Sequence, residues 1–174
     1  MKIGIRDERP PVPADRLEEA ATAVAELGHP IPPSYRAFLT EQDGGKPVRD
    51  SFAFREGERQ QEDMVRVFFG IAESPNGDLV ETVEAYAGRI PRGTLPIAED
   101  HLGNLLLLDG RDGADGPVWF WDHELEPEGD EPEDVNLSFV AADLAGFLEQ
   151  LTEDTEPEPE PAEQPKGWRR LFSR

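Results

Sequence analysis

Residues 90–124 of this chain read IPRGTLPIAEDHLGNLLLLDGRDGADGPVWFWDHE, and this stretch decides the fold. It contains two short apolar runs, LLLL at 105–108 and VWFW at 118–121, joined by a loop rich in Gly and Asp. Short apolar runs flanked by turn residues are typical of strands, so the stretch predicts a β-hairpin. A run that is apolar at every position is typical of a strand covered on both faces. Alternation places Trp119 and Trp121 on one face and Phe120 on the other, and we expect Trp121 in the core.

Two helices are expected before the first strand. Residues 15–27 carry apolar side chains at helical spacing, with Asp15 and Glu18 as a capping-box-like pair at the start. Gly28 stands where a helix-ending glycine is expected. A shorter helix is expected at 34–42, because prolines precede it and a Gly-Gly pair follows it.

Further elements follow along the chain. Apolar, β-branched and aromatic residues predict strands at 51–54 and 65–69, separated by a very polar loop at 56–63. Helical spacing predicts helices at about 78–88 and 140–150. Helices first, and then mostly antiparallel strands with helices between them, indicate an α+β fold with helices packed on one face of the sheet.

The chain changes character after residue 151. We expect one folded domain at 1–151, followed by an acidic, Pro-rich segment at 152–165 that is disordered. Residues 166–174, KGWRRLFSR, are basic and amphipathic. In a helix, the side chains of Trp168, Leu171 and Phe172 would share one face. This terminal segment has three interpretations: a motif that docks on a protein partner or weakly on a membrane surface, a solvated tail, or a tail that folds back onto the acidic surface of the domain.

Charge and composition restrict the function. The formal net charge is −21 over 174 residues, which argues against direct binding to nucleic acid and favours a basic partner. The chain has no cysteine, so disulfides and cysteine-based sites are excluded. No apolar run approaches the roughly 20 residues that a membrane span requires, and we expect a cytoplasmic protein without a transmembrane segment.

No catalytic motif was found, and we expect neither an enzyme nor a cofactor. The sequence has no P-loop, dinucleotide-binding fingerprint or nucleophile elbow. His101 and His123 could meet at one end of the hairpin as a metal or acid–base site, but acidic and histidine side chains at strand ends usually face water and cap local backbone. Asp109, Asp112 and Asp115 depart from the EF-hand pattern, and we interpret them as turn residues rather than a calcium site.

Four ordered motifs resemble the SUKH superfamily, which contains fungal cell-wall-assembly regulators and many bacterial toxin-immunity proteins. Together they span roughly residues 15–151. The first comprises Leu27, Gly28, Pro32, Tyr35, Phe38, Leu39, Asp43, Gly44 and Gly45. The second comprises Ile90, Pro91, Gly93, Pro96, Ile97, Ala98, Gly103 and Asn104. The third is Gly116, Val118, Trp121, Asp122 and His123, and the fourth is Ser138, Phe139, Leu144, Phe147 and Leu148.

The resemblance implies a non-catalytic protein-binding domain. It implies an immunity protein that neutralises a cognate toxin by occlusion, and the acidic charge suits a basic toxin domain such as a nuclease. The alternative is a regulatory interaction module of the cell-wall-assembly-regulator type, unrelated to toxins. The candidate partner-binding residues are Asp100, His101, Trp119, Asp122, His123, Glu124, Glu126, Glu128, Trp168, Leu171 and Phe172.

Overall fold

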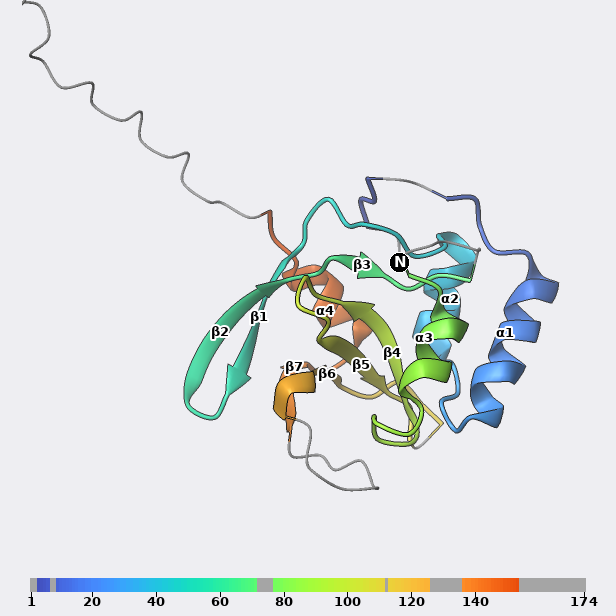
Figure 1. Cartoon of the computed structure of the whole chain (residues 1–174). Helices are drawn as coiled ribbons and strands as arrows, with labels where there is room; N and C mark the ends of the chain where they lie inside the picture. Colours follow the sequence, from blue (N-terminus) through green and yellow to red (C-terminus); the bar gives the residue numbers. More distant parts are fainter. Residues whose placement is uncertain (1–2, 7–8, 72–76, 112, 126–135, 154–174) are drawn as a thin grey trace, which may run out of the picture.

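A computed structural model of the chain describes residues 3–6, 9–71, 77–111, 113–125 and 136–153. These residues form an α+β fold, as predicted, in which a seven-stranded antiparallel sheet has the order β2-β1-β7-β6-β5-β4-β3 (Figure 1). The strands are β1 Ser51–Glu56, β2 Arg59–Met64, β3 Val67–Phe68, β4 Thr94–Glu99, β5 Leu105–Asp109, β6 Val118–Trp121 and β7 Leu137–Ala141. The helices are α1 Ala14–Glu26, α2 Pro33–Glu41, α3 Leu79–Tyr86 and α4 Leu144–Gln150, with a 3-10 turn, η1, at His123–Leu125.

The predicted hairpin is confirmed as β5 and β6 at the centre of the sheet. Its register pairs Leu105 with Trp121 and Leu108 with Val118. All four leucines of β5 are buried, as expected for a strand covered on both faces. Trp121 is fully buried, and its ring meets the Tyr86 ring of α3 edge-on, 5.8 Å between centroids. The expectation that Trp121 belongs to the core is therefore confirmed.

The N-terminal helices lie close to their predicted positions, but the predicted capping box is wrong. Pro13 occupies the N-cap position of α1 and gives no side-chain cap, which leaves Asp15 inside the first turn. Its carboxylate accepts instead from the backbone N–H of Arg16. The end of the helix is as predicted, because Gly28 adopts a φ of 92° that other residues rarely take.

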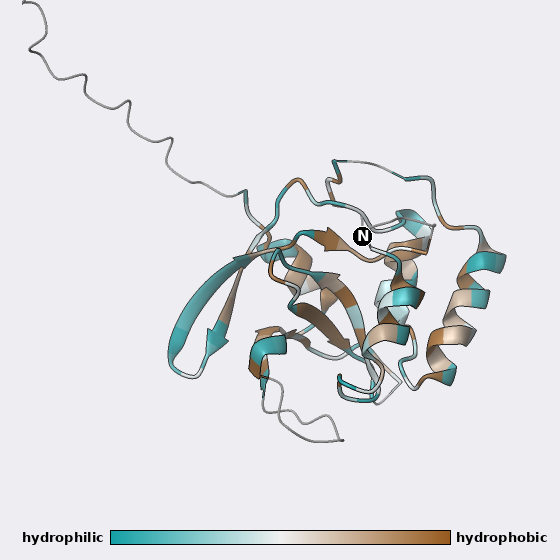
Figure 2. Ribbon diagram, in the orientation of Figure 1, coloured by the Kyte–Doolittle hydropathy of each residue, from teal (hydrophilic) through white to brown (hydrophobic). Residues whose placement is uncertain are grey.

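The predicted polar loop at 56–63 is also wrong. Most of it forms β2, which pairs with β1 in a hairpin from Ser51↔Met64 to Glu56↔Arg59. Gly57, with a φ of 61°, allows the tight reversal between the two strands. β2 lies at the edge of the sheet, where polar side chains face water, and Figure 2 shows β2 as hydrophilic whereas part of β1 is hydrophobic.

The C-terminal helix begins later than predicted. Residues 137–141 form β7, and α4 starts only after Asp143, whose carboxylate accepts from the N–H of Gly146 at 2.7 Å. β4 was also not predicted, because Pro96 interrupts its apolar pattern; the register shifts between Pro96 and Ala98.

The helices are anchored by buried contacts. α1, α2 and α3 gather beside β3 and β4, whereas α4 lies against β1 and β7 (Figure 1). The Tyr35 hydroxyl of α2 lies 2.6 Å from the carbonyl oxygen of Phe69 and 2.8 Å from that of Ile97, and joins the helix to the sheet. Burial raises the pKa of this hydroxyl well above its usual range, so it remains a neutral donor.

Candidate functional site

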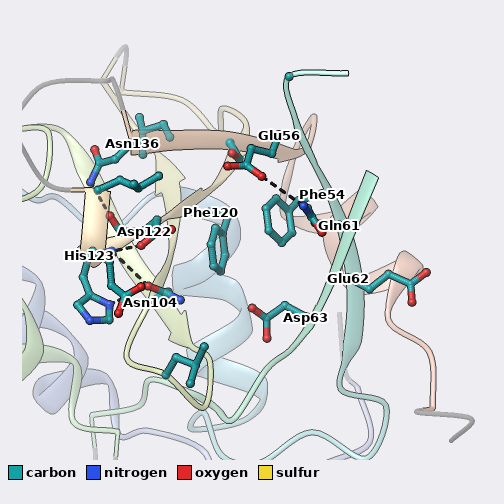
Figure 3. A pocket seen from close by; sticks show the side chains of 16 residues that line it. Phe54, Glu56, Gln61, Glu62, Asp63, Asn104, Phe120, Asp122, His123 and Asn136 are labelled. Atoms are coloured by element: carbon teal, nitrogen blue, oxygen red, sulfur yellow. Dashed lines mark hydrogen bonds between the residues drawn. The ribbon is translucent and has the colours of Figure 1, made fainter. Parts of the chain in front are cut away.

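An open groove of about 420 Å³ lies where the β1–β2 hairpin curls toward the ends of β6 and β7 (Figure 3). Its walls come from β1 and β2 on one side and from β6, β7 and η1 on the other. The turn between β4 and β5 closes one end. The groove therefore exists only because the polar segment after β1 folds back as a strand.

The floor of the groove is aromatic. The rings of Phe54 and Phe120 stack with centroids 4.4 Å apart and an interplanar angle of 19°. Phe52 lies behind them and contacts both rings. Figure 3 shows the stacked pair in the middle of the groove, with carboxylates around it.

Two exposed leucines stand among the residues that line the groove. Leu102, in the turn after β4, is 76% exposed, and Leu125, at the end of η1, is 56% exposed. They are the two most exposed large hydrophobic side chains of the described residues. Exposed apolar side chains beside an aromatic floor are typical of a protein-binding surface.

Carboxylates dominate the charge of the groove. Among the described residues that line it, Lys and Arg are absent, and His123 is the only side chain that can carry positive charge. The acidic residues whose side chains face the groove are Glu56, Asp63, Asp122 and Glu124, whereas the side chain of Glu62 lies on the other face of β2 and points away (Figure 3). We call the groove, with this floor, these leucines and these acids, the acidic groove. Its field favours a cationic surface.

A hydrogen-bond network fixes the end of the groove beside the β4–β5 turn. Asp100 Oδ1 accepts from the backbone N–H groups of Leu102, Gly103 and Asn104, at 2.7 to 2.8 Å. Its Oδ2 accepts from Asn104 Nδ2 at 2.7 Å. The Asn104 side-chain oxygen in turn accepts from the backbone N–H of His123 and lies 2.7 Å from its Nδ1. Asp100 and Asn104 therefore hold the Leu102 turn and η1 in place relative to each other.

Asp63 faces this network from β2. Burial raises the pKa of the Asp63 carboxyl, and the charge of Asp100 and a hydrogen bond between the two carboxyl groups raise it further. The N–H of Met64 and the nearby His101 act in the opposite direction but do not cancel the rise. The carboxyl groups of Asp63 and Asp100 thus interact across the gap between the β1–β2 hairpin and the β4–β5 turn.

The structure brings only some of the predicted site residues together. Asp122, His123 and Glu124 line the acidic groove, and His101 is exposed in the turn beside it. Asp100 is 1% exposed with both oxygens occupied, so it organises the turn rather than offering a contact. Trp119 is half-buried outside the groove, with its ring edge-on to Phe139. The remaining five lie outside the described residues: Glu126, Glu128, Trp168, Leu171 and Phe172.

The alternative metal readings gain no support. Within the described ranges, no group of three or more His, Asp or Glu side chains is arranged to hold a metal ion. Asp109 is engaged by its own neighbour: although burial raises the pKa of this carboxyl, hydrogen bonds and charge from Arg111 lower it overall. Asp115 accepts from the backbone N–H of Ser34 at 2.8 Å, and Asp112 lies outside the described residues.

Sequence reasoning missed half of the groove. Phe54, Glu56 and Glu62 belong to the β1–β2 hairpin, whose second strand lies in the segment predicted as a polar loop. Leu102 and Leu125 belong to no sequence motif. The sequence signal for this hairpin was Gly57, which stands between two segments of similar length that could pair as strands.

The fold and the groove define a class of protein: an α+β domain with an antiparallel sheet and an acidic, partly apolar groove suited to a protein partner. The model of the SMI1 / KNR4 family (SUKH-1) matches residues 16–150, and the chain belongs to this family. The chain is also 28% identical over 143 residues to an SPbeta prophage-derived uncharacterized protein, YokK, of Bacillus subtilis (strain 168); the match covers 74% of this chain and 70% of that protein. No solved structure matches the chain. None of the helices in the described ranges is long and apolar enough to span a membrane.

Proposed function

We propose that this chain is an immunity protein that neutralises a cognate toxin by direct occlusion, with the acidic groove as its contact surface. One observation carries the proposal: the carboxylates of Glu56, Asp63, Asp122 and Glu124 surround an aromatic floor and two exposed leucines, and no lysine or arginine is among the described lining residues. Membership of the SUKH-1 family supports an immunity role, and similarity to a prophage-derived protein is in keeping with it.

The negative charge of the groove supports a partner with a basic surface. A toxin domain whose substrate is an anionic polymer needs a basic cleft, because the phosphate backbone is bound by Lys and Arg. Such a cleft complements the acidic groove and is attracted to it over a distance, which speeds encounter. Leu102 and Leu125 would add the apolar contact that slows dissociation.

Co-expression with a toxin domain encoded by a gene next to this one tests the proposal, and a stand-alone gene with no toxin gene nearby would favour the regulatory alternative. Cells that make the toxin and the full chain should grow, whereas cells that make the toxin with a Leu102→Ser/Leu125→Ser variant should grow poorly. Val48→Ser is a matched control, because Val48 is also exposed, at 41%, but lies outside the groove. Equal rescue by all variants would show that the groove does not bind the toxin. Failure of the wild-type chain to rescue growth would argue against an immunity role.

A further inference from the structure

We propose that the acidic groove is occupied, when no partner is bound, by the basic terminal segment of the same chain, residues 166–174. This segment, KGWRRLFSR, contains four basic residues and no acidic one. The inference does not depend on the identity of any toxin, because it concerns the groove and the tail of one molecule.

The chain leaves the described domain close to the groove. Thr152 pairs with Ser51 at the start of β1, so the last described residues lie against the strand that forms one groove wall. Phe54 is three residues further along β1, about 10 Å away at the rise of a strand. The exit of the chain and the acidic groove therefore lie on the same strand, a short distance apart.

The intervening chain is long enough. Twelve residues, 154–165, separate the last described residue from the basic segment. Fully extended, they would span up to about 40 Å, several times the distance to Phe54. Because the terminal segment is tethered to the domain, its effective concentration at the groove should be in the millimolar range, so even a weak contact would be populated.

The terminal segment and the acidic groove complement each other in charge and both carry apolar side chains. Arg169 and Arg170 would meet a groove with four acidic side chains. The apolar side chains of Trp168, Leu171 and Phe172 would find the stacked rings on the floor and the two exposed leucines. Other acidic surfaces of the domain offer the charge without this apolar area; on α1, for example, Glu19 and Glu26 are exposed and the apolar residues Leu17, Ala20, Ala21 and Val24 face the core.

Paramagnetic relaxation enhancement, measured by NMR on the full chain, tests whether the terminal segment occupies the groove. The chain has no cysteine, so Ser173→Cys gives a single site for a nitroxide label beside Phe172. In ¹⁵N-labelled protein at low salt, the amide signals of Leu102, Glu124 and Ser138 should lose about half of their intensity or more, as expected for a contact favoured by millimolar effective concentration. Raising the salt to about 1 M, where the Debye length is about 3 Å, should restore them.

Variants on both sides of the contact make the test specific. Arg169→Glu/Arg170→Glu in the tail, or Glu56→Arg/Glu124→Arg in the groove, should remove the broadening, and combining all four should recover part of it. Glu19→Arg/Glu26→Arg on α1 carries the same charge change away from the groove and should leave the broadening intact.

Three results would overturn the proposal. The first is broadening spread evenly over the domain or centred elsewhere. The second is a pattern that Arg169→Glu/Arg170→Glu does not alter. The third is broadening of groove signals in a mixture of ¹⁵N-labelled chains without nitroxide and unlabelled chains with it, since the segment would then dock on a second molecule.

Discussion

Phe54 of β1 and Phe120 of β6 stack at 4.4 Å although β7 runs between their strands. The contact is possible because the sheet is strongly curled and because the residue of β7 that pairs with Phe120 is the small Ser138. The stack thus joins the β1–β2 hairpin to the centre of the sheet and forms the floor of the acidic groove.

A double-mutant cycle on Phe54→Ala and Phe120→Ala measures this contact. Each substitution removes an aromatic ring, so each should destabilise the domain. The coupling between them should be about 1 kcal/mol, the usual value for an aromatic pair. Urea denaturation of the four proteins gives the coupling free energy. Strictly additive losses would mean that the rings contribute independently and that the stack does not hold the hairpin.

Asn104→Asp should be strongly destabilising near neutral pH, by about 3 kcal/mol. The substitution replaces the donor that bonds Asp100 Oδ2 with a carboxylate and places two negative charges in a buried site. Asn104→Ala loses this donor and also the oxygen that accepts from His123, but it adds no charge and should cost less. The difference between the two variants in urea denaturation should shrink as the pH is lowered. A difference that does not depend on pH would rule out the electrostatic explanation.

Gly44→Ala and Gly57→Ala separate a steric clash from backbone strain. Both glycines have positive φ, 57° and 61°. A Cβ at Gly44 would lie 2.5 Å from the carbonyl oxygen of Phe68, whereas one at Gly57 would meet nothing within 4 Å. We expect Gly57→Ala to cost about 1 kcal/mol and Gly44→Ala clearly more. Thermal denaturation of both variants checks the order, and equal losses would contradict it.

Asp63→Asn should stabilise the domain near neutral pH. The folded-state pKa of Asp63 is raised above 3.8, so the folded protein binds this proton more tightly than the unfolded chain does. Its contribution to the free energy of unfolding therefore falls as the pH rises from 3.8 through the folded-state pKa. The substitution removes this loss, and the gain should not exceed about 1 kcal/mol because the side chain is partly solvated.

Denaturation of the Asp63→Asn variant across pH checks the sign. Its advantage over wild type should disappear as the pH approaches 3.8. Glu62→Gln is the control on the same strand, since Glu62 is exposed and its loss should change stability little. A variant that is less stable than wild type at neutral pH would show that the Asp63 carboxylate stabilises the fold.

Strands could be predicted from the sequence where their apolar pattern matches their burial in the fold. The leucines of β5 and the aromatic residues of β6 could be assigned to a central hairpin because both faces of these strands are covered. β2 could not be assigned in this way. Its sequence, RQQEDM, is polar because it lies at an edge, and its strand structure comes from pairing with β1 rather than from its own residues.

The acidic character of the groove could be predicted from the sequence, but its position in the fold could not. The net charge indicated a basic partner, and Asp122, His123 and Glu124 do line the groove. The floor could not be inferred, because Phe54 and Phe120 are far apart in the sequence and meet only through the curl of the sheet. Asp100 resembled a contact residue, but its position before a turn with a positive-φ Gly103 made it a backbone cap.

If the terminal segment occupies the groove, a partner must displace it. The affinity of a toxin for the full chain would then rise when Arg169→Glu/Arg170→Glu removes the competitor. Calorimetric titration of both proteins with the same toxin domain measures this rise. An unchanged affinity would mean that toxin and tail use different surfaces.

Calorimetric titration of the full chain with a toxin domain encoded by a gene next to its own, with and without Glu56→Arg/Glu124→Arg, measures whether the acidic groove binds the toxin. We expect tight binding by wild type, a loss of about tenfold or more for the groove variant, and little change for Glu19→Arg/Glu26→Arg. Equal affinity for all three proteins, or no binding by wild type, would contradict the claim that the acidic groove is the surface that neutralises the toxin.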